Sequence, residues 1–150
     1  MGNRVLTSAL ADLLKPGRGA QPFRVNEVVL MAADISTTVF RERAPAFIPA
    51  ASRSTLYASS TDRVLRVSEK LSAGPRAGEG SRDIVVLRGM DSIDASAIDT
   101  GTLGLNHGDR SSVIYDLNQL VHGTAADKRL DLHQTRNSQG AYWEFMKVKN

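Results

Sequence analysis

Three places in the sequence carry residue types that together could perform acyl transfer. His107 lies between glycines in Gly104-Leu105-Asn106-His107-Gly108-Asp109, where a loop could project an imidazole into a cleft. Asp62 supplies a carboxylate earlier in the chain. Met1 and Gly2 precede an apolar helix, which is typical of the second half of a Gly-x-Ser-x-Gly turn that exposes a serine nucleophile. We therefore expect the serine one position before Met1.

These residues would fill distinct roles in the reaction. An imidazole takes the proton of the nucleophile, a carboxylate fixes the imidazole, and backbone N–H groups hold the oxyanion. We predict that His107 is the base and Asp62 is the acid. Met1 and Gly2 would be the remnant of the oxyanion hole. Asp34, in Ala32-Ala33-Asp34-Ile35, is the alternative acid because it ends the preceding strand.

Each assignment has a purely structural alternative. An aspartate at a helix start, such as Asp62, also accepts backbone N–H bonds. His107 could be a solvated loop histidine, and any chain can begin Met-Gly. The order of the residues along the chain favours the catalytic interpretation.

Two further histidines and a cluster of aspartates in the long loop are not expected to be catalytic. His122 ends a helix and would complement its dipole, whereas His133 lies in a hairpin. Asp91, Asp94 and Asp99 lack the spacing and central glycine of a Ca²⁺ loop, so we expect solvated loop acids. No metal ion or organic cofactor is indicated.

Composition narrows the classes of partner. The 150 residues are 41% hydrophobic and 23% charged, with no cysteine, so disulfides and thiolate sites are excluded. The net charge is +3, but acidic residues are interspersed with the basic ones, and we predict no nucleic-acid binding. No apolar stretch reaches the length of about 18 residues that spans a bilayer. The sequence leaves the compartment open, with the cytoplasm favoured.

Hydrophobic periodicity predicts alternating helices and strands. The apolar run at 24–33 is typical of a strand buried on both faces of a parallel sheet. The expected elements, in chain order, are a helix at 3–14, a loop at 17–22, a strand at 24–33, a short helical or irregular piece from Thr37 broken by Pro45 and Pro49, a strand at 54–59, a helix at 62–71, a loop at 73–82, a strand at 83–88, a long polar loop at 89–110, a helix at 111–121, and a hairpin that turns at Asn137-Ser138-Gln139-Gly140.

This order predicts an α/β fold with parallel strands, flanking helices and a C-terminal β-hairpin. We expect a single domain over residues 1–150, with 127–150 as a hairpin extension. Asp34, Asp62 and His107 each follow a predicted strand. Chemistry gathers at the carboxyl ends of the strands in such sheets, so these side chains should lie at one edge.

Several motifs point to one family. They are Met1-Gly2-Asn3-Arg4, Ala32-Ala33-Asp34-Ile35, Thr55-Leu56-Tyr57-Ala58-Ser59-Ser60-Thr61-Asp62-Arg63-Val64-Leu65, Ile93-Asp94-Ala95-Ser96, His107 and Gly140-Ala141-Tyr142-Trp143. On these motifs the chain resembles the C-terminal half of a bacterial α/β-hydrolase family of largely uncharacterised function, often described as esterase- or lipase-like. The resemblance implies a partial α/β-hydrolase fold, the order Ser…Asp…His, and hydrolysis of acyl esters.

The resemblance also implies what the chain would lack. With its nucleophile before Met1, it should be inactive alone, and an apolar edge strand without its neighbours should favour a homo-oligomer. The alternative is a non-catalytic scaffold or interaction module derived from the same fold. Phe40, Phe47 and Tyr57 could line an acyl pocket, although core packing is the favoured interpretation.

Overall fold

The computed structural model describes residues 2–13, 25–60, 74–80, 83–98 and 110–146, and its elements confirm an α/β fold. The helices are α1 (Gly2–Leu13), α2 (Thr37–Phe47) and α5 (Arg110–Val121), with 3-10 turns η1 (Ile48–Ala50) and η3 (Ala126–Lys128). The strands are β1 (Val25–Met31), β2 (Ala51–Ala58), β3 (Asp91–Asp94), β4 (Leu132–Asn137) and β5 (Gly140–Phe145). The expected helix at 62–71 and loop at 17–22 lie outside the described residues.

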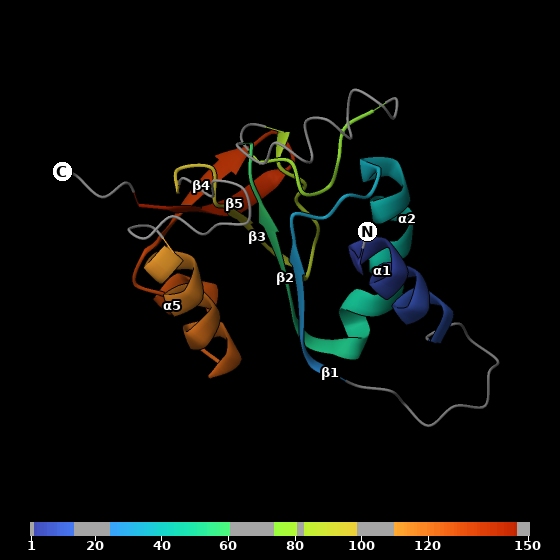
Figure 1. The fold of residues 1–150 in the computed structure, drawn as a ribbon, viewed down its shortest axis with the longest axis horizontal. Coiled ribbons are helices and arrows are strands. Elements are labelled where there is room, and N and C mark those ends of the chain that lie inside the picture. The colour runs from blue at the N-terminus through green and yellow to red at the C-terminus, as the bar shows by residue number, and fades with distance from the viewer. Residues whose placement is uncertain (1, 14–24, 61–73, 81–82, 99–109, 147–150) are drawn as a thin grey trace.

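The strands form one sheet in the order β1-β2-β3-β5-β4. The pairs β1–β2, β2–β3 and β3–β5 are parallel, and β4 returns antiparallel to β5. Figure 1 shows α1 and α2 on one side of this sheet and α5 on the other. The parallel pairing brings the carboxyl ends of β1, β2 and β3 to the same edge, as the sequence predicts.

The sheet separates two aliphatic cores. On one face, Leu30 and Leu56 pack in a buried cluster with Phe40 of α2. Phe40 and Phe47 of α2 also contact each other in this first cluster, with their ring centroids 6.4 Å apart. On the other face, Tyr57 and Ile93 pack in a cluster that includes Leu120 of α5. The three aromatic residues that could have lined an acyl pocket are therefore core residues, each at most 3% exposed.

β1 differs from its prediction, because it is not buried on both faces. Val28 and Leu30 are buried against α1 and α2, whereas Met31 is 43% exposed on the opposite face. Within the described sheet β1 is an edge strand that pairs with β2. The continuous burial belongs to β2, whose last five residues, Ser54–Ala58, are all buried between the two helical layers.

The third parallel strand also lies elsewhere than predicted. Residues 84–87 have no regular structure, and β3 forms at Asp91–Asp94, inside the expected polar loop. The apolar run misled the prediction because Ile84 and Val85 are buried by packing on the sheet and its helices. The Ser92 hydroxyl donates to the Val85 carbonyl, 2.6 Å away. β3 owes its strand conformation to pairing with β2 and β5, which outweighs its polar composition.

Pro45 does not end α2, contrary to expectation. The helix continues to Phe47, and Phe40, Ala44 and Phe47 form its buried stripe. The chain breaks only at Ile48–Ala50, a 3-10 turn that contains Pro49. Burial of this stripe compensates for the missing N–H of Pro45.

The C-terminal hairpin is confirmed. The Asn137 side chain accepts N–H bonds from Gln139 and Gly140, at 2.8 and 3.1 Å, and so closes the turn. Gly140 has φ +147°, a conformation that favours glycine. β5 pairs with β3 through Ile93↔Trp143 and Asp94↔Glu144, so the hairpin extends the same sheet.

Gly78 tests how the strand ends are packed. A Cβ there would lie 2.2 Å from the backbone nitrogen of Ala33. We expect Gly78→Ala to lower the free energy of unfolding by about 3 kcal/mol, because backbone must move to admit a methyl group. Urea unfolding measures the loss. Gly2→Ala is the matched control, since a Cβ at Gly2 meets nothing within 4 Å. Equal stability of the two variants would contradict the close packing.

Candidate functional site

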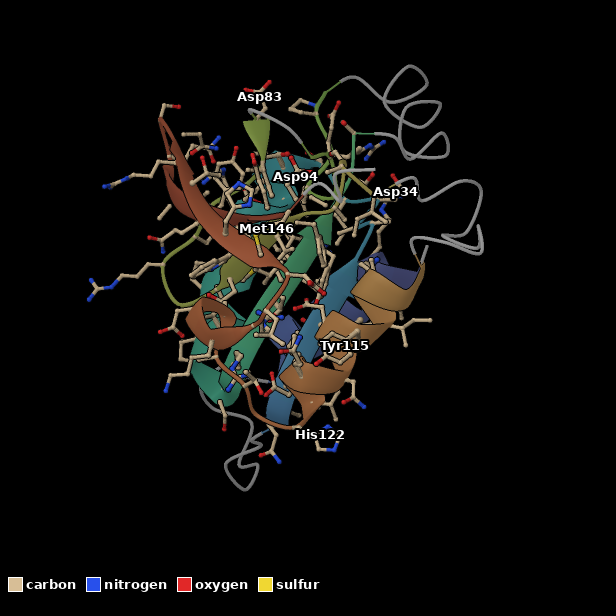
Figure 2. The ribbon with its side chains drawn as sticks, turned by 90° about the vertical axis from the view of Figure 1, so that its left-hand side faces the viewer. Asp34, Asp83, Asp94, Tyr115, His122 and Met146 are labelled. Carbon is tan, nitrogen blue, oxygen red and sulfur yellow. The ribbon has the colours of Figure 1, made fainter. Side chains whose placement is uncertain are left out.

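The carboxyl edge of the sheet gathers several polar groups. Asp34 follows β1, Ser59 and Ser60 follow β2, and Asp94 ends β3. Figure 2 shows Asp34 and Asp94 toward one end of the molecule and His122 at the opposite end. Among the described residues, this edge is therefore the place where acid and hydroxyl groups from three strands converge.

Asp34 is held by a cation. Its Oδ1 lies 3.4 Å from Nε of Arg76, whose side chain is 5% exposed. The Arg76 backbone also forms an isolated antiparallel bridge with Ser36. A carboxylate beside a buried guanidinium is engaged in charge pairing, which weakens Asp34 as the partner of a catalytic imidazole.

Asp94 is buried rather than solvated, contrary to the expectation for the loop acids. It is 6% exposed, and its Oδ1 accepts hydrogen bonds from the backbone N–H of Ser96 at 2.8 Å and from the Ser96 hydroxyl. The Ser96 oxygen in turn accepts the N–H of Ser60, 2.8 Å away. A short chain of hydrogen bonds thus joins the ends of β3 and β2. Asp91 is half-buried, and Asp99 lies outside the described residues.

The predicted acid Asp62, the base His107 and the terminal Met1 also lie outside the described residues. The nearest described residues are Ser60, two positions before Asp62, and Arg110 of α5, three positions after His107. Gly2 is the first residue of α1. The Asn3 side chain donates to the carbonyl of Met31 at 2.7 Å, so the first turn of α1 lies at the carboxyl end of β1.

The other two histidines have structural partners. Nδ1 of His122 lies 2.8 Å from the carbonyl of Asn118, which confirms its role at the end of α5. His133 lies across the hairpin from Glu144, with Nε2 and Oε2 3.3 Å apart, and the Tyr142 hydroxyl donates to the other oxygen of Glu144 at 2.8 Å. His133 is exposed, Glu144 is half-buried and Tyr142 is buried.

A buried polar network on the face of β2 that α5 covers was not predicted from the sequence. The Tyr57 hydroxyl donates to Oδ2 of Asp116, and Nη1 of Arg129 donates to the same oxygen at 2.9 Å. The side chains of Asp116 and Arg129 are fully buried. The available signal was the position of Asp116, on the apolar stripe of α5 between Val113 and Leu120, where an acid needs a partner.

The network shifts the ionisation of its members. Burial raises the pKa of the Tyr57 phenol, and the hydrogen bond to Asp116 raises it further. Burial also raises the pKa of the Asp116 carboxyl, against the opposing effects of the Tyr57 hydroxyl and the Arg129 charge. The network ties β2, α5 and the segment after η3 together at a fixed geometry.

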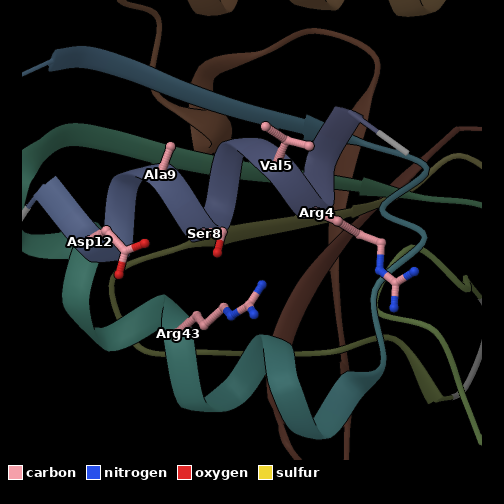
Figure 3. A pocket seen from close by; sticks show the side chains of 6 residues that line it. All are labelled: Arg4, Val5, Ser8, Ala9, Asp12 and Arg43. Atoms are coloured by element: carbon pink, nitrogen blue, oxygen red, sulfur yellow. The ribbon is translucent and has the colours of Figure 1, made fainter.

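An open groove lies between α1 and α2. Its volume is about 580 Å³, and Figure 3 shows its lining, which consists of Arg4, Val5, Ser8, Ala9, Asp12 and Arg43. These side chains come from the outer surfaces of two helices. The lining of the groove includes neither Asp34 nor Asp94.

Comparison with known families decides the relationship. Residues 1–122 match the family described as "Alpha/beta hydrolase of unknown function (DUF900)". The chain belongs to this α/β-hydrolase family. The match covers α1 through α5, and the β4–β5 hairpin of this DUF900 member follows it. No curated protein and no solved structure matches the chain.

Two further properties of this DUF900 protein concern the described residues alone. They contain no group of three or more histidine, cysteine, aspartate or glutamate side chains placed to hold a metal ion. None of their helices combines the length and apolar character needed to cross a membrane.

The buried Tyr57 predicts an alkaline loss of stability. Because the folded state raises the pKa of this phenol, its contribution is complete below the unfolded pKa of about 10 and is lost as the pH rises above it. Urea unfolding from pH 8 to pH 11 should show this decline in the parent protein. Tyr57→Phe should flatten the decline and lower stability at pH 8 by about 1 kcal/mol. Tyr115→Phe, at a half-exposed position on α5, is the control, and an unchanged slope in Tyr57→Phe would contradict the assignment.

Proposed function

We propose that this chain is the C-terminal part of a serine hydrolase that cleaves acyl esters, with Asp62 as acid and His107 as base. In this proposal Met1 and Gly2 follow the nucleophilic serine of the elbow, and the 150 residues supply the acid and the base but not the nucleophile. The observation that carries the proposal is the position of α1. Its first turn lies beside the end of β1, through the bond from Asn3 to Met31, and so reaches the edge where the polar groups gather.

The start of α1 suits the chemistry of an elbow. A helix N-terminus presents free backbone N–H groups and a partial positive charge. The N–H of the residue after the serine, here Met1, would help to hold the oxyanion, with Gly2 allowing the tight turn into the helix. Residues 1–122, which include α1, match the α/β-hydrolase family.

The choice of acid rests on the surroundings of Asp34 and on chain connectivity. Asp34 is paired with Arg76, which leaves Asp62 as the better partner for an imidazole. Two residues of extended chain span about 7 Å, so the two steps from Ser60 to Asp62 keep the acid near the end of β2. His107 belongs to the connection from β3 to α5, and the ends of β2 and β3 are joined by the Ser96–Ser60 hydrogen bond.

Restoring the nucleophile tests the activity. A chain extended upstream with the family's elbow, Gly-x-Ser, should hydrolyse p-nitrophenyl esters and react with a fluorophosphonate probe. We expect His107→Ala to abolish turnover and Asp62→Asn to lower it about 10⁴-fold, because the imidazole loses its orienting charge. Asp34→Asn and His122→Ala are the matched controls, the second at the opposite end of the molecule. An extended chain without hydrolysis and without a reactive serine would sink the proposal.

A second candidate is a non-catalytic interaction module that pairs with a copy of itself. Apolar side chains are exposed on β1 at Met31, on α1 at Val5 and Leu6, and on α5 at Ile114 and Tyr115. The exposed fractions of Val5 and Ile114 are 67% and 63%. An edge strand with apolar surface around it is a template for pairing with another chain.

Light scattering over a concentration series separates this candidate from a monomer. If β1 edges associate, the parent chain should be dimeric at micromolar concentration, and Met31→Lys should shift the dissociation constant upward at least tenfold, since a charge would enter the interface. Leu130→Lys is the control, because Leu130 is 67% exposed and precedes β4 at the other edge. A monomer at all concentrations would exclude self-association, and an unaltered dimer in Met31→Lys would exclude this surface.

A further inference from the structure

The carboxyl ends of β2 and β3 are joined by a directed chain of hydrogen bonds. Asp94 Oδ1 accepts both the N–H and the hydroxyl of Ser96, and the Ser96 oxygen accepts the N–H of Ser60 at 2.8 Å. A serine hydroxyl has one proton and two lone pairs. Because the carboxylate takes that proton, the lone pairs of Ser96 are left for the backbone of Ser60.

The backbone of Gly80 packs directly against this cluster of side chains. A Cβ at Gly80 would lie 2.5 Å from the Ser96 oxygen, 2.6 Å from Asp94 Oδ1 and 2.9 Å from the Cα of Ser59. Only a residue without a side chain lets the backbone approach so closely. The Ser59 N–H also donates to the Gly78 carbonyl at 2.9 Å, so the 74–80 segment covers the ends of both strands. The carboxylate and hydroxyl are thereby confined to one arrangement.

We propose that Asp94 and Ser96 are positioning residues. They fix the end of β2, after which Asp62 follows in the chain, relative to the end of β3, after which His107 follows. This inference rests on the proposed function, because it concerns the same acid and base. Asp94 acts on the imidazole through Ser96 and Ser60, and it is not a second catalytic acid. Its burial and its two bonds to Ser96 commit the Oδ1 oxygen to this link.

The pKa of His107, measured in the 150-residue chain by NMR titration, tests the link. The signals are assigned by comparison with His107→Gln. A carboxylate near an imidazole favours the charged form, so Asp62→Asn should lower this pKa by about one unit. Ser96→Ala should lower it by at least half of that amount. In the double variant the pKa should equal that of Asp62→Asn, because the serine acts through the aspartate.

Ser92→Ala is the matched control. It removes a serine hydroxyl within β3, which donates to the Val85 carbonyl and forms no bond to the end of β2. It should leave the pKa of His107 unchanged. Asp94→Asn is the second variant, which keeps the shape of the side chain while its amide can donate to the Ser96 oxygen. Amide exchange at Ser60 should accelerate at least tenfold in Ser96→Ala and remain at the parental rate in Ser92→Ala.

The outcomes separate the two proposals. If Asp62→Asn lowers the pKa of His107 while Ser96→Ala and Asp94→Asn leave it unchanged, the positioning role is wrong and the acid–base pair stands. An additive decrease in the double variant also overturns the positioning role, because the serine would then act independently of Asp62. If Asp62→Asn itself has no effect, the pairing of Asp62 with His107 fails.

Discussion

The candidate site depends on one constraint, which is the packing of the backbone of residues 74–80 onto the strand ends. Gly78 donates its N–H to the carbonyl of Ala33 after β1 and accepts the N–H of Ser59 after β2. Gly80 lies against Asp94 and Ser96 at the end of β3. Three strand ends are therefore held by backbone contacts too close to admit a side chain. These contacts fix the relative positions of the strand ends, and therefore the positions of any reacting groups at this edge.

A second constraint acts from the other face of the sheet. Arg129, Asp116 and Tyr57 form a buried charged network that connects α5 to β2. Removing one member of a buried ion pair costs about 3–5 kcal/mol, because the remaining charge is left without compensation. Asp116 Oδ1 and the Nε and Nη2 atoms of Arg129 lack hydrogen-bond partners within the described residues, so the network is only partly satisfied. Its contribution is geometric rather than a large gain in stability.

Together these constraints explain how the sheet presents its polar edge. The carboxyl ends of the parallel strands lie at one edge of the sheet, and residues 74–80 pack on them. The buried network holds α5 against the sheet, and α5 is the helix that follows His107 in the chain. Met31 of β1, the edge strand of the described sheet, and Ile114 of α5 are exposed. Membership of the α/β-hydrolase family accounts for the parallel core, while the hairpin adds two strands at the opposite edge.

The sequence alone determined what depends on local periodicity and on turn chemistry. It predicted α1, α5, β1 and β2 close to their observed bounds, the turn at Asn137–Gly140, and the gathering of strand ends at one edge. It could not locate β3, because a polar Asp-Ser-Ile-Asp segment becomes a strand only when β2 and β5 bind both its sides.

Tertiary structure also decided the environments of the acids. Asp34 and Asp94 look alike in the sequence, as polar residues in or near loops. The fold pairs Asp34 with an arginine and buries Asp94 beneath a glycine, through partners that are distant along the chain. Periodicity reports which face of an element is apolar, but the charge and hydrogen-bond partners of a side chain depend on contacts between elements, and these exist only once the chain has folded.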